Sequence, residues 1–163
     1  MWSRWCGRGP TSGLAMWVSE AGYQLDGSKD RLDLNAVERW LAAESYWAFG
    51  RSLADIKKSI DNSLAWGLYS PEGEQVGFFR IVTDQITFAW LCDVFVDASQ
   101  RGRGLAVWAL EIIRDEILAM GVYRIILATS DAHGVYEKLG FTAQAEPEKW
   151  MELTTRRMGI GGS

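Results

Sequence analysis

The spacing of apolar residues changes along the chain, and the changes predict its elements. Apolar positions three and four residues apart predict a helix over Leu34–Ala43, with Asp33 as its N-cap. The same spacing recurs over Ser52–Asn62, where Ser52 is the expected cap. An apolar stretch ahead of both helices, Leu14–Ala21, is predicted as an edge strand.

The middle of the chain alternates with a period of two, which is typical of β-strands. Two predicted strands, Leu64–Tyr69 and Val76–Val82, are joined by a turn at Pro71–Gly73. A second turn at Asp84-Gln85 leads into Ile86–Val96. This last stretch is long and apolar, so we expect it to be a central strand.

The second half of the chain returns to helical spacing. Leu105–Met120 is the clearest helix, and Gly121 is suited to its C-terminal cap. Val122–Ala128 is mostly apolar and is predicted to lie parallel to the long strand, because a helix joins the two. A short helix is expected near Ala132–Lys138. Two further strands are expected to close the sheet as a hairpin: Phe141–Ala145 and Trp150–Leu153.

This order of elements predicts an α/β fold (α+β) built on a mixed sheet: an antiparallel meander, one βαβ crossover, a helix and a final hairpin. The chain has 163 residues, of which 48% are hydrophobic, so one domain with a sizeable core is expected. We place that domain at residues 14–155, between an N-terminal tail at 1–13 and a C-terminal tail at 156–163.

Composition excludes several classes of partner. A net charge of −4 disfavours a nucleic-acid binder, which usually presents a basic face. No apolar run approaches the roughly 20 residues that a membrane span needs, and the first residues lack the apolar core of a signal peptide. The two cysteines, Cys6 and Cys92, lack metal-type spacing, and His133 is the one histidine. We therefore expect a cytoplasmic protein with no metal, no membrane and no nucleic acid among its partners.

The strongest chemical signal is the loop between the long strand and the clearest helix. It reads Arg101-Gly102-Arg103-Gly104-Leu105-Ala106. The first N–H groups of a helix have no internal partner and lie at the positive end of its dipole, so they attract anions. Glycines let a phosphate approach the backbone, and the arginines add charge, so the loop suits a pyrophosphate. The alternative is an ordinary strand-to-helix connection.

Two nucleotide-binding motifs are excluded by the residues that follow the loop. A dinucleotide fingerprint needs a third glycine where Val107 stands. A triphosphate loop needs Gly-Lys followed by Ser or Thr, and that sequence is absent.

Two motifs in register resemble the signatures of the GNAT superfamily of N-acetyltransferases. The first is Asp93-Val94-Phe95-Val96 followed by Arg-x-x-Gly-x-Ala at Arg101, Gly104 and Ala106. The second is Ala132-His133-Gly134-Val135-Tyr136-Glu137-Lys138-Leu139-Gly140-Phe141. The resemblance implies a GNAT fold, a central mixed seven-stranded sheet flanked by about four helices. It also implies direct transfer of an acetyl group from acetyl-CoA to a primary amine in a ternary complex.

The resemblance also implies roles for individual residues. The strand end at Val94, Phe95 and Val96 is expected to face the pantetheine arm, and the loop from Arg101 to Ala106 to hold the pyrophosphate. Thr129 stands where many relatives have an asparagine near that arm. Tyr136 matches the tyrosine that often protonates the departing thiolate. Its alternative role is packing on a short helix.

Asp93 is the candidate general base. Direct transfer needs a neutral amine, so a group must take the amine proton directly or through water. Asp93 is an acidic residue within an apolar strand, and burial makes a carboxylate a stronger proton acceptor, which suits a base. The alternative is a structural carboxylate bonded to nearby backbone. The strand is expected to bulge, as in the family, so the pattern does not fix the face that Asp93 takes.

Aromatic residues are candidates for the acceptor pocket: Tyr46, Trp47 and Trp90. Their alternative role is core packing. The run Trp47-x-x-Gly50-Arg51-Ser52 resembles a narrower bacterial branch of unassigned substrate. The acceptor is expected to be a small-molecule or peptide amine, and a homodimer remains open.

Two other classes of function compete with the enzyme. A non-catalytic acyl-CoA sensor could use the same fold, because fold does not fix function. Retention of Tyr136 and Asp93 favours catalysis. A nucleic-acid module built on the Arg-Gly repeat is disfavoured by the net acidity of the chain.

Overall fold

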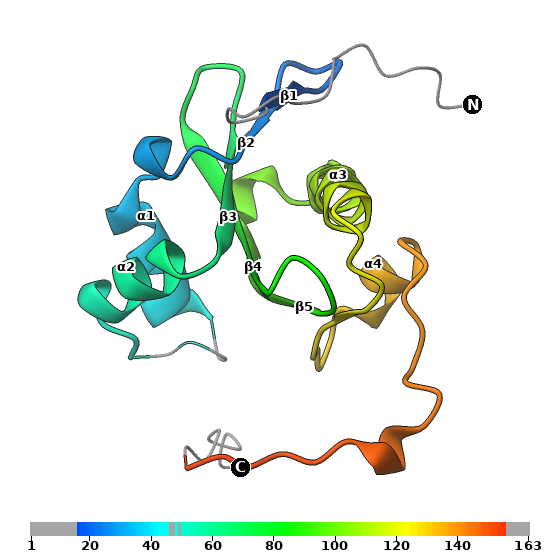
Figure 1. Ribbon diagram of the computed structural model, residues 1–163. Helices are drawn as coiled ribbons and strands as arrows, with labels where there is room; N and C mark the ends of the chain where they lie inside the picture. Colours follow the sequence, from blue (N-terminus) through cyan, green and yellow to red (C-terminus); the bar gives the residue numbers. More distant parts are fainter. Residues whose placement is uncertain (1–15, 46–47, 49, 156–163) are drawn as a thin grey trace.

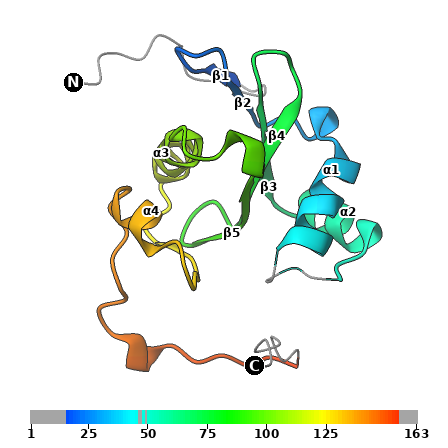
Figure 2. The same cartoon turned by 180° about the vertical axis from the view of Figure 1, so that it is seen from behind.

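A computed structural model describes residues 16–45, 48 and 50–155, and the two predicted tails lie outside this part of the chain. Its centre is one sheet in which the strands follow their sequence order. Helices cover both faces of this sheet, as two opposite views show (Figures 1 and 2).

The strands are β1 (Met16–Val18), β2 (Gln24–Asp26), β3 (Leu64–Tyr69), β4 (Gln75–Thr83), β5 (Ala89–Val96) and β6 (Ile125–Ile126). The helices are α1 (Leu34–Glu38), α2 (Leu53–Asp61), α3 (Leu105–Ala119) and α4 (His133–Glu137). Shorter helical turns are η1 (Lys29–Arg31), η2 (Arg39–Glu44), η3 (Ala98–Gln100) and η4 (Pro147–Lys149).

The sheet is mixed, as the order of elements predicted. Neighbouring strands from β1 to β5 pair antiparallel, and β6 alone runs parallel to β5. The parallel pair is joined through α3, because a crossover helix returns the chain to the same end of the sheet. The fold class is therefore confirmed.

The α1 and α2 helices cover one face of the sheet and begin at the predicted caps. One Asp33 carboxylate oxygen accepts from the backbone N–H groups of Asn35 and Ala36, at 3.0 and 3.1 Å. The Ser52 hydroxyl accepts from the backbone N–H of Asp55. The first helix continues as the π-helical turn η2, where Trp40 stacks on Phe95 of β5 with ring centroids 5.4 Å apart. This contact fixes α1 and η2 against the central strand.

The α3 helix covers the opposite face and forms the larger core. Its buried residues include Leu110, Ile113 and Ile117, and they pack with Phe79 and Leu91 of the sheet. The helix predicted over Leu105–Met120 is thus confirmed, and it ends at Ala119. Burial of apolar surface supplies most of the stability of such a two-layer arrangement.

Three sequence expectations differ from the structure. β6 has two residues instead of the seven predicted over Val122–Ala128, and β2 was not predicted. The closing strands at Phe141–Ala145 and Trp150–Leu153 do not form within the described chain, so its sheet has six strands and not seven. These segments are extended but find no neighbouring strand, because an alternating sequence favours a strand conformation without supplying a partner.

The cap at Asp33 generates a stability prediction. Asp33→Ala removes the oxygen that two N–H groups of α1 use, so the free energy of unfolding should fall by about 0.5–2 kcal/mol. Denaturant unfolding measures this change. Asp30→Ala removes the same charge from an exposed position in η1 and should change stability far less. Equal effects from both variants would show that charge, and not the cap, causes the loss.

Candidate active site

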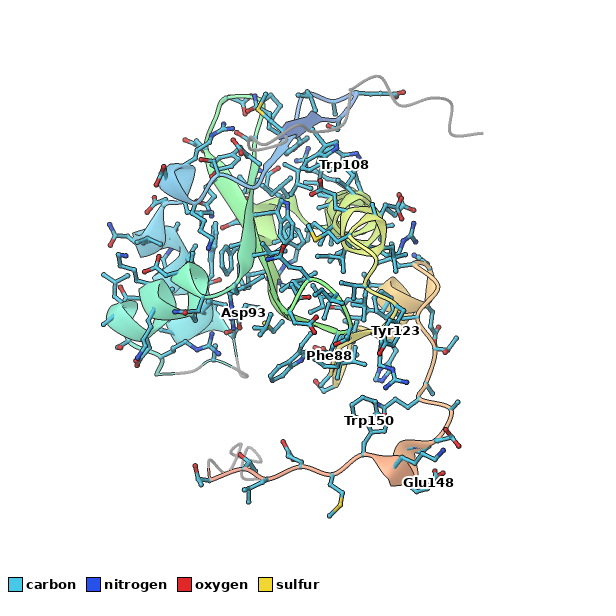
Figure 3. All side chains as sticks on the ribbon, viewed as in Figure 1. Phe88, Asp93, Trp108, Tyr123, Glu148 and Trp150 are labelled. Carbon is cyan, nitrogen blue, oxygen red and sulfur yellow. The ribbon has the colours of Figure 1, made fainter. Side chains whose placement is uncertain are left out.

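The centre of the candidate site is a bulge in β5. Phe78 pairs with Phe95 and Arg80 pairs with Cys92, so one residue of β4 faces two residues of β5, Asp93 and Val94. Asp93 adopts a φ of 47°, a left-handed conformation that is uncommon outside glycine. Consecutive side chains of a strand point to opposite faces, and the bulge shifts this alternation so that Leu91 and Val94 lie on the same face. Val94 packs against the α3 core, and Asp93 faces α1 and α2 (Figure 3).

Two arginines hold the Asp93 carboxylate. Its Oδ2 accepts from Nη1 of Arg51 and from Nε of Arg80, each at 2.7 Å. The Asp93 side chain is 1% exposed, while those of Arg51 and Arg80 are 21% and 11% exposed. Arg80 lies on β4 and Arg51 lies just before α2. The carboxylate therefore connects β5 with its neighbouring strand and with the start of a helix on the α1 and α2 face.

No prediction from the sequence paired these three residues. A signal was available, because Arg80 is the charged residue within the apolar run of β4, as Asp93 is within β5. Two charged residues in adjacent buried strands are expected to neutralise each other. Arg51 lies 42 residues from Asp93, and no local pattern links them.

The predicted anion loop has the geometry that its glycines suggested. Gly102 and Gly104 have φ of 77° and 74°, and Gly104 is the N-cap of α3 without a side-chain partner for the first N–H groups. A side chain added at either glycine would meet nothing within 4 Å, so open space lies beside the backbone. This space and these N–H groups can hold a phosphate. Leu105 is buried and Ala106 half-buried, so they anchor the first turn of α3.

The two arginines of the loop act differently. Arg101 donates from Nε to the carbonyl oxygen of Val96 at 2.9 Å, and its guanidinium carbon lies 5.3 Å from the centroid of Phe95. These contacts hold its charge close to the end of β5. Arg103 is exposed. Its charge lies at the surface of the loop, where it can approach a ligand phosphate.

The edge of β5 opens beside this loop. β6 pairs with β5 only at Ala89 and Trp90, so within the described chain no strand pairs with the β6 side of residues 91–96. Backbone N–H and C=O groups need partners, so this edge can accept a ligand that carries amide groups. Val94, Phe95 and Val96, predicted to face the pantetheine arm, all belong to this stretch.

Tyr136 lies on α4, on the α3 side of the sheet. Its ring meets that of Phe141 edge-on at 5.9 Å, and it packs against the same core as Val94. The hydroxyl oxygen of Thr129 accepts from the backbone N–H of Ala132 at 3.0 Å, so it supports the turn that precedes α4. The two candidate catalytic groups, Tyr136 and Asp93, therefore belong to opposite faces of the sheet.

The remaining predicted residues are only partly brought to this region. Trp90 is 48% exposed and pairs with Val82, two positions from the Arg80–Cys92 pair, so it shares a face of the sheet with Arg80. Tyr46 and Trp47 lie outside the described residues.

Burial raises the pKa of the Cys92 thiol to about 11, so this thiol stays protonated at neutral pH and is a poor nucleophile.

The described residues form neither a metal-ligand cluster nor a membrane-spanning helix. Across residues 16–45, 48 and 50–155, no group of three or more His, Cys, Asp or Glu side chains is arranged to hold a metal ion. No described helix combines the length and the apolar character that a membrane span requires.

Comparison with known proteins agrees with this geometry. The sequence model of the Acetyltransferase (GNAT) family matches residues 34–141, which include the loop, Asp93 and Tyr136. The curated "Putative acetyltransferase FG08082" of Gibberella zeae is 27% identical over 126 residues, which cover 66% of this chain and 71% of that protein.

Solved structures show the same likeness. A GNAT-family protein of Xanthomonas campestris pv. campestris is 36% identical, with a TM-score of 0.77 over 81% of this chain and 92% of that one. An acetyltransferase of Trypanosoma brucei is 26% identical, with a TM-score of 0.58 over 87% and 99% of the two chains. The bulged strand, the anion loop opening α3 and these matches together lead to one assignment: the chain belongs to the GNAT acetyltransferase family.

Proposed function

We propose that this protein is an N-acetyltransferase that moves the acetyl group of acetyl-CoA to a primary amine by direct attack in a ternary complex. Membership of the family implies acyl transfer. One observation supports acetyl-CoA as the acyl donor. Gly102 and Gly104, both in the left-handed conformation, lie before α3, and the neighbouring edge of β5 has no paired strand in the described chain. That combination offers a phosphate site and an amide-binding edge in continuous order along the chain.

In this proposal, acetyl-CoA binds along the loop and then along the edge of β5. The backbone N–H groups from Gly102 to Ala106, with Arg101 and Arg103, bind the pyrophosphate. Val94, Phe95 and Val96 offer backbone groups to the pantetheine arm, and Thr129 lies near it from the α4 side. Acetyl-CoA supplies the acetyl thioester when it is bound. No metal takes part in this proposal.

The position of the reacting atoms follows from the two faces of the sheet. Asp93 approaches from the α1 and α2 face, and Tyr136 from the α3 and α4 face. If Asp93 and Tyr136 both act on the acetyl thioester, the thioester lies where β5 and β6 separate, since that opening is accessible from both faces of the sheet. The amine nitrogen then forms a bond to the carbonyl carbon while the carbon–sulfur bond breaks. Tyr136 gives its phenolic proton to the departing sulfur.

Asp93 has two candidate roles. In the first, it accepts the amine proton, directly or through one water; because Oδ2 already binds two guanidinium groups, Oδ1 is the oxygen available for this role. In the second, it is a positioning residue that fixes the bulge, and the amine proton passes to water. The two ion pairs favour the second role, and burial at the bulge is compatible with both.

Trp90 is the described residue proposed for the acceptor pocket, and Tyr46 and Trp47 complete that proposal.

The competing function is a non-catalytic acyl-CoA sensor. A panel of primary amines, incubated with acetyl-CoA and followed by release of the coenzyme thiol, separates the two. Thiol release with any amine supports the enzyme. Tight binding of acetyl-CoA without turnover on the whole panel supports the sensor.

Substitution of the loop tests cofactor binding. Gly104→Glu places a side chain and a negative charge where the pyrophosphate is proposed to lie, so the Kd for acetyl-CoA should rise at least about tenfold. Calorimetry measures the change. Gly73→Glu is the matched control, because Gly73 is another left-handed glycine with open space beside it, in the turn between β3 and β4. Similar affinities in both variants would remove the loop from the binding site.

Tyr136→Phe tests the general acid. The change keeps the ring that packs against Phe141 and removes the proton, so kcat should fall by roughly 10²–10⁴ while the affinity for acetyl-CoA stays nearly constant. Tyr123→Phe is the control, since Tyr123 is 73% exposed. A loss below about threefold in the Tyr136 variant would mean that water or another group supplies the proton.

Asp93→Asn separates the two roles of this residue. If Asp93 is the base, kcat falls and the acidic limb of the pH–rate profile moves or disappears. If it is a positioning residue, the profile keeps its shape and stability falls by about 3–5 kcal/mol, because the change leaves two guanidinium groups without their anion. Asp61→Asn removes an exposed ion pair with Lys57 and should alter neither quantity appreciably.

A further inference from the structure

Arg51 and Arg80 carry more positive charge than Asp93 neutralises. Both guanidinium groups donate to the same carboxylate oxygen, so the three side chains together carry one net positive charge. In the described chain, neither arginine forms an ion pair with a second carboxylate. Their side chains are largely withdrawn from water, and a charge in that position is unfavourable without a counter-ion. The cluster therefore favours binding of an anion.

Both arginines have N–H groups left for that anion. Each guanidinium has five N–H donors. Arg51 uses Nη1 on Asp93, and Arg80 uses Nε on Asp93 and Nη1 on the Ser63 hydroxyl at 3.5 Å. No nitrogen of either arginine is among the buried polar atoms that lack a partner in the described chain, so the unused donors reach solvent. Such donors in a planar group match the two oxygens of a carboxylate.

The cluster lies beside the opening where the acetyl thioester is proposed to lie. Asp93 belongs to the stretch of β5 that β6 leaves unpaired, and Arg80 pairs with Cys92, which precedes Asp93. Adjacent strands are about 4.8 Å apart, so the side chains of β4 are close to this opening. One small molecule can therefore place an amine at the thioester and an anionic group on the arginines.

An apolar surface continues from the cluster on the same face of the sheet. Val82 and Trp90 pair directly across β4 and β5, two positions beyond the Arg80–Cys92 pair, so all four side chains share that face. Val82 is 38% exposed and Trp90 is 48% exposed, whereas Phe78, farther along β4 on this face, is buried beneath the helices. An exposed aliphatic and aromatic pair beside a charged group suits a ligand that is apolar at one end.

We propose that the acceptor is a free amino acid with an apolar side chain, an inference that rests on the proposed N-acetyltransferase activity and names its substrate class. Arg51 and Arg80 bind the carboxylate, and Val82 and Trp90 contact the side chain. The amine nitrogen bonds to the thioester carbon as the carbon–sulfur bond breaks. Its proton passes to the base or to water, and the general acid protonates the sulfur. The products are an N-acetylamino acid and the coenzyme thiol.

Two related classes of acceptor fit the cluster less well. The amine end of a peptide is followed by an amide, which lacks the charge that the arginines complement. A phosphate monoester carries close to two negative charges at neutral pH, and the cluster supplies one positive charge. A carboxylate carries one negative charge and therefore balances the cluster.

Matched compounds test the carboxylate. Leucine, phenylalanine and tryptophan are each compared with the amine that lacks the carboxylate and with the amide that replaces it, by release of the coenzyme thiol. For at least one of the three, kcat/KM should be about tenfold to a hundredfold higher for the acid than for either analogue. The amide is the stricter comparison, because its amine is less basic and a larger fraction of it is neutral. A parallel comparison of 2-aminoethyl phosphate with 2-aminoethanol tests phosphate.

The outcomes separate this inference from the proposed function. Turnover without a preference for the acid, or a preference confined to the phosphate, would overturn the amino-acid assignment and leave the N-acetyltransferase proposal standing. No turnover with any compound would overturn both.

Substitution of Arg51 tests its role in binding the carboxylate. Arg51→Gln removes the surplus charge and leaves Arg80 paired with Asp93, so the ratio of kcat/KM for the acid to that for its amine should fall at least about tenfold. A loss of folded protein lowers both rates equally and does not change this ratio. Arg51→Lys keeps the charge and should retain more of the preference. Arg31→Gln breaks the arginine–aspartate pair at β2, so it is the matched control and should retain all of it. An unchanged ratio in Arg51→Gln would overturn the inference.

Discussion

The bulge at Asp93 is the constraint on which the site depends. The extra residue in β5 shifts the alternation of its side chains, so that Leu91 and Val94 both pack in the α3 core while Asp93 faces the other side of the sheet. The left-handed conformation of Asp93 is unfavourable by itself. Two charge-assisted hydrogen bonds from Arg51 and Arg80 hold the carboxylate in place and offset that cost. The same three residues connect two strands and a helix start.

β5 and β6 separate after Trp90, ahead of the bulge at Asp93. A ladder of two residue pairs leaves most of the β6 side of β5 without a paired strand in the described chain. An unpaired backbone edge is unfavourable unless water or a ligand satisfies it. The adjacent loop adds the positive end of α3 and two arginines to a chain whose net charge is −4. The positive charge beside this edge is therefore local to the loop.

Within the part of the chain that the structure describes, β6 pairs with β5 alone, and the two segments predicted to close the sheet do not join it. An alternating pattern favours a strand conformation but does not supply the neighbouring strand.

The sequence by itself determined the elements whose signals are local. The helical spacing of α3, the caps at Asp33 and Ser52, the alternation of β3 and β4, and the loop before α3 each depend on residues a few positions apart. The two motifs around Asp93 and Tyr136 were sufficient to identify the family. The tertiary structure alone decided the face of Asp93, its pairing with Arg51 and Arg80, the shortness of β6 and the course of residues 142–155 after α4. Those features depend on contacts between residues distant in the chain, and a local pattern specifies which side of a strand is apolar but not which strand it meets.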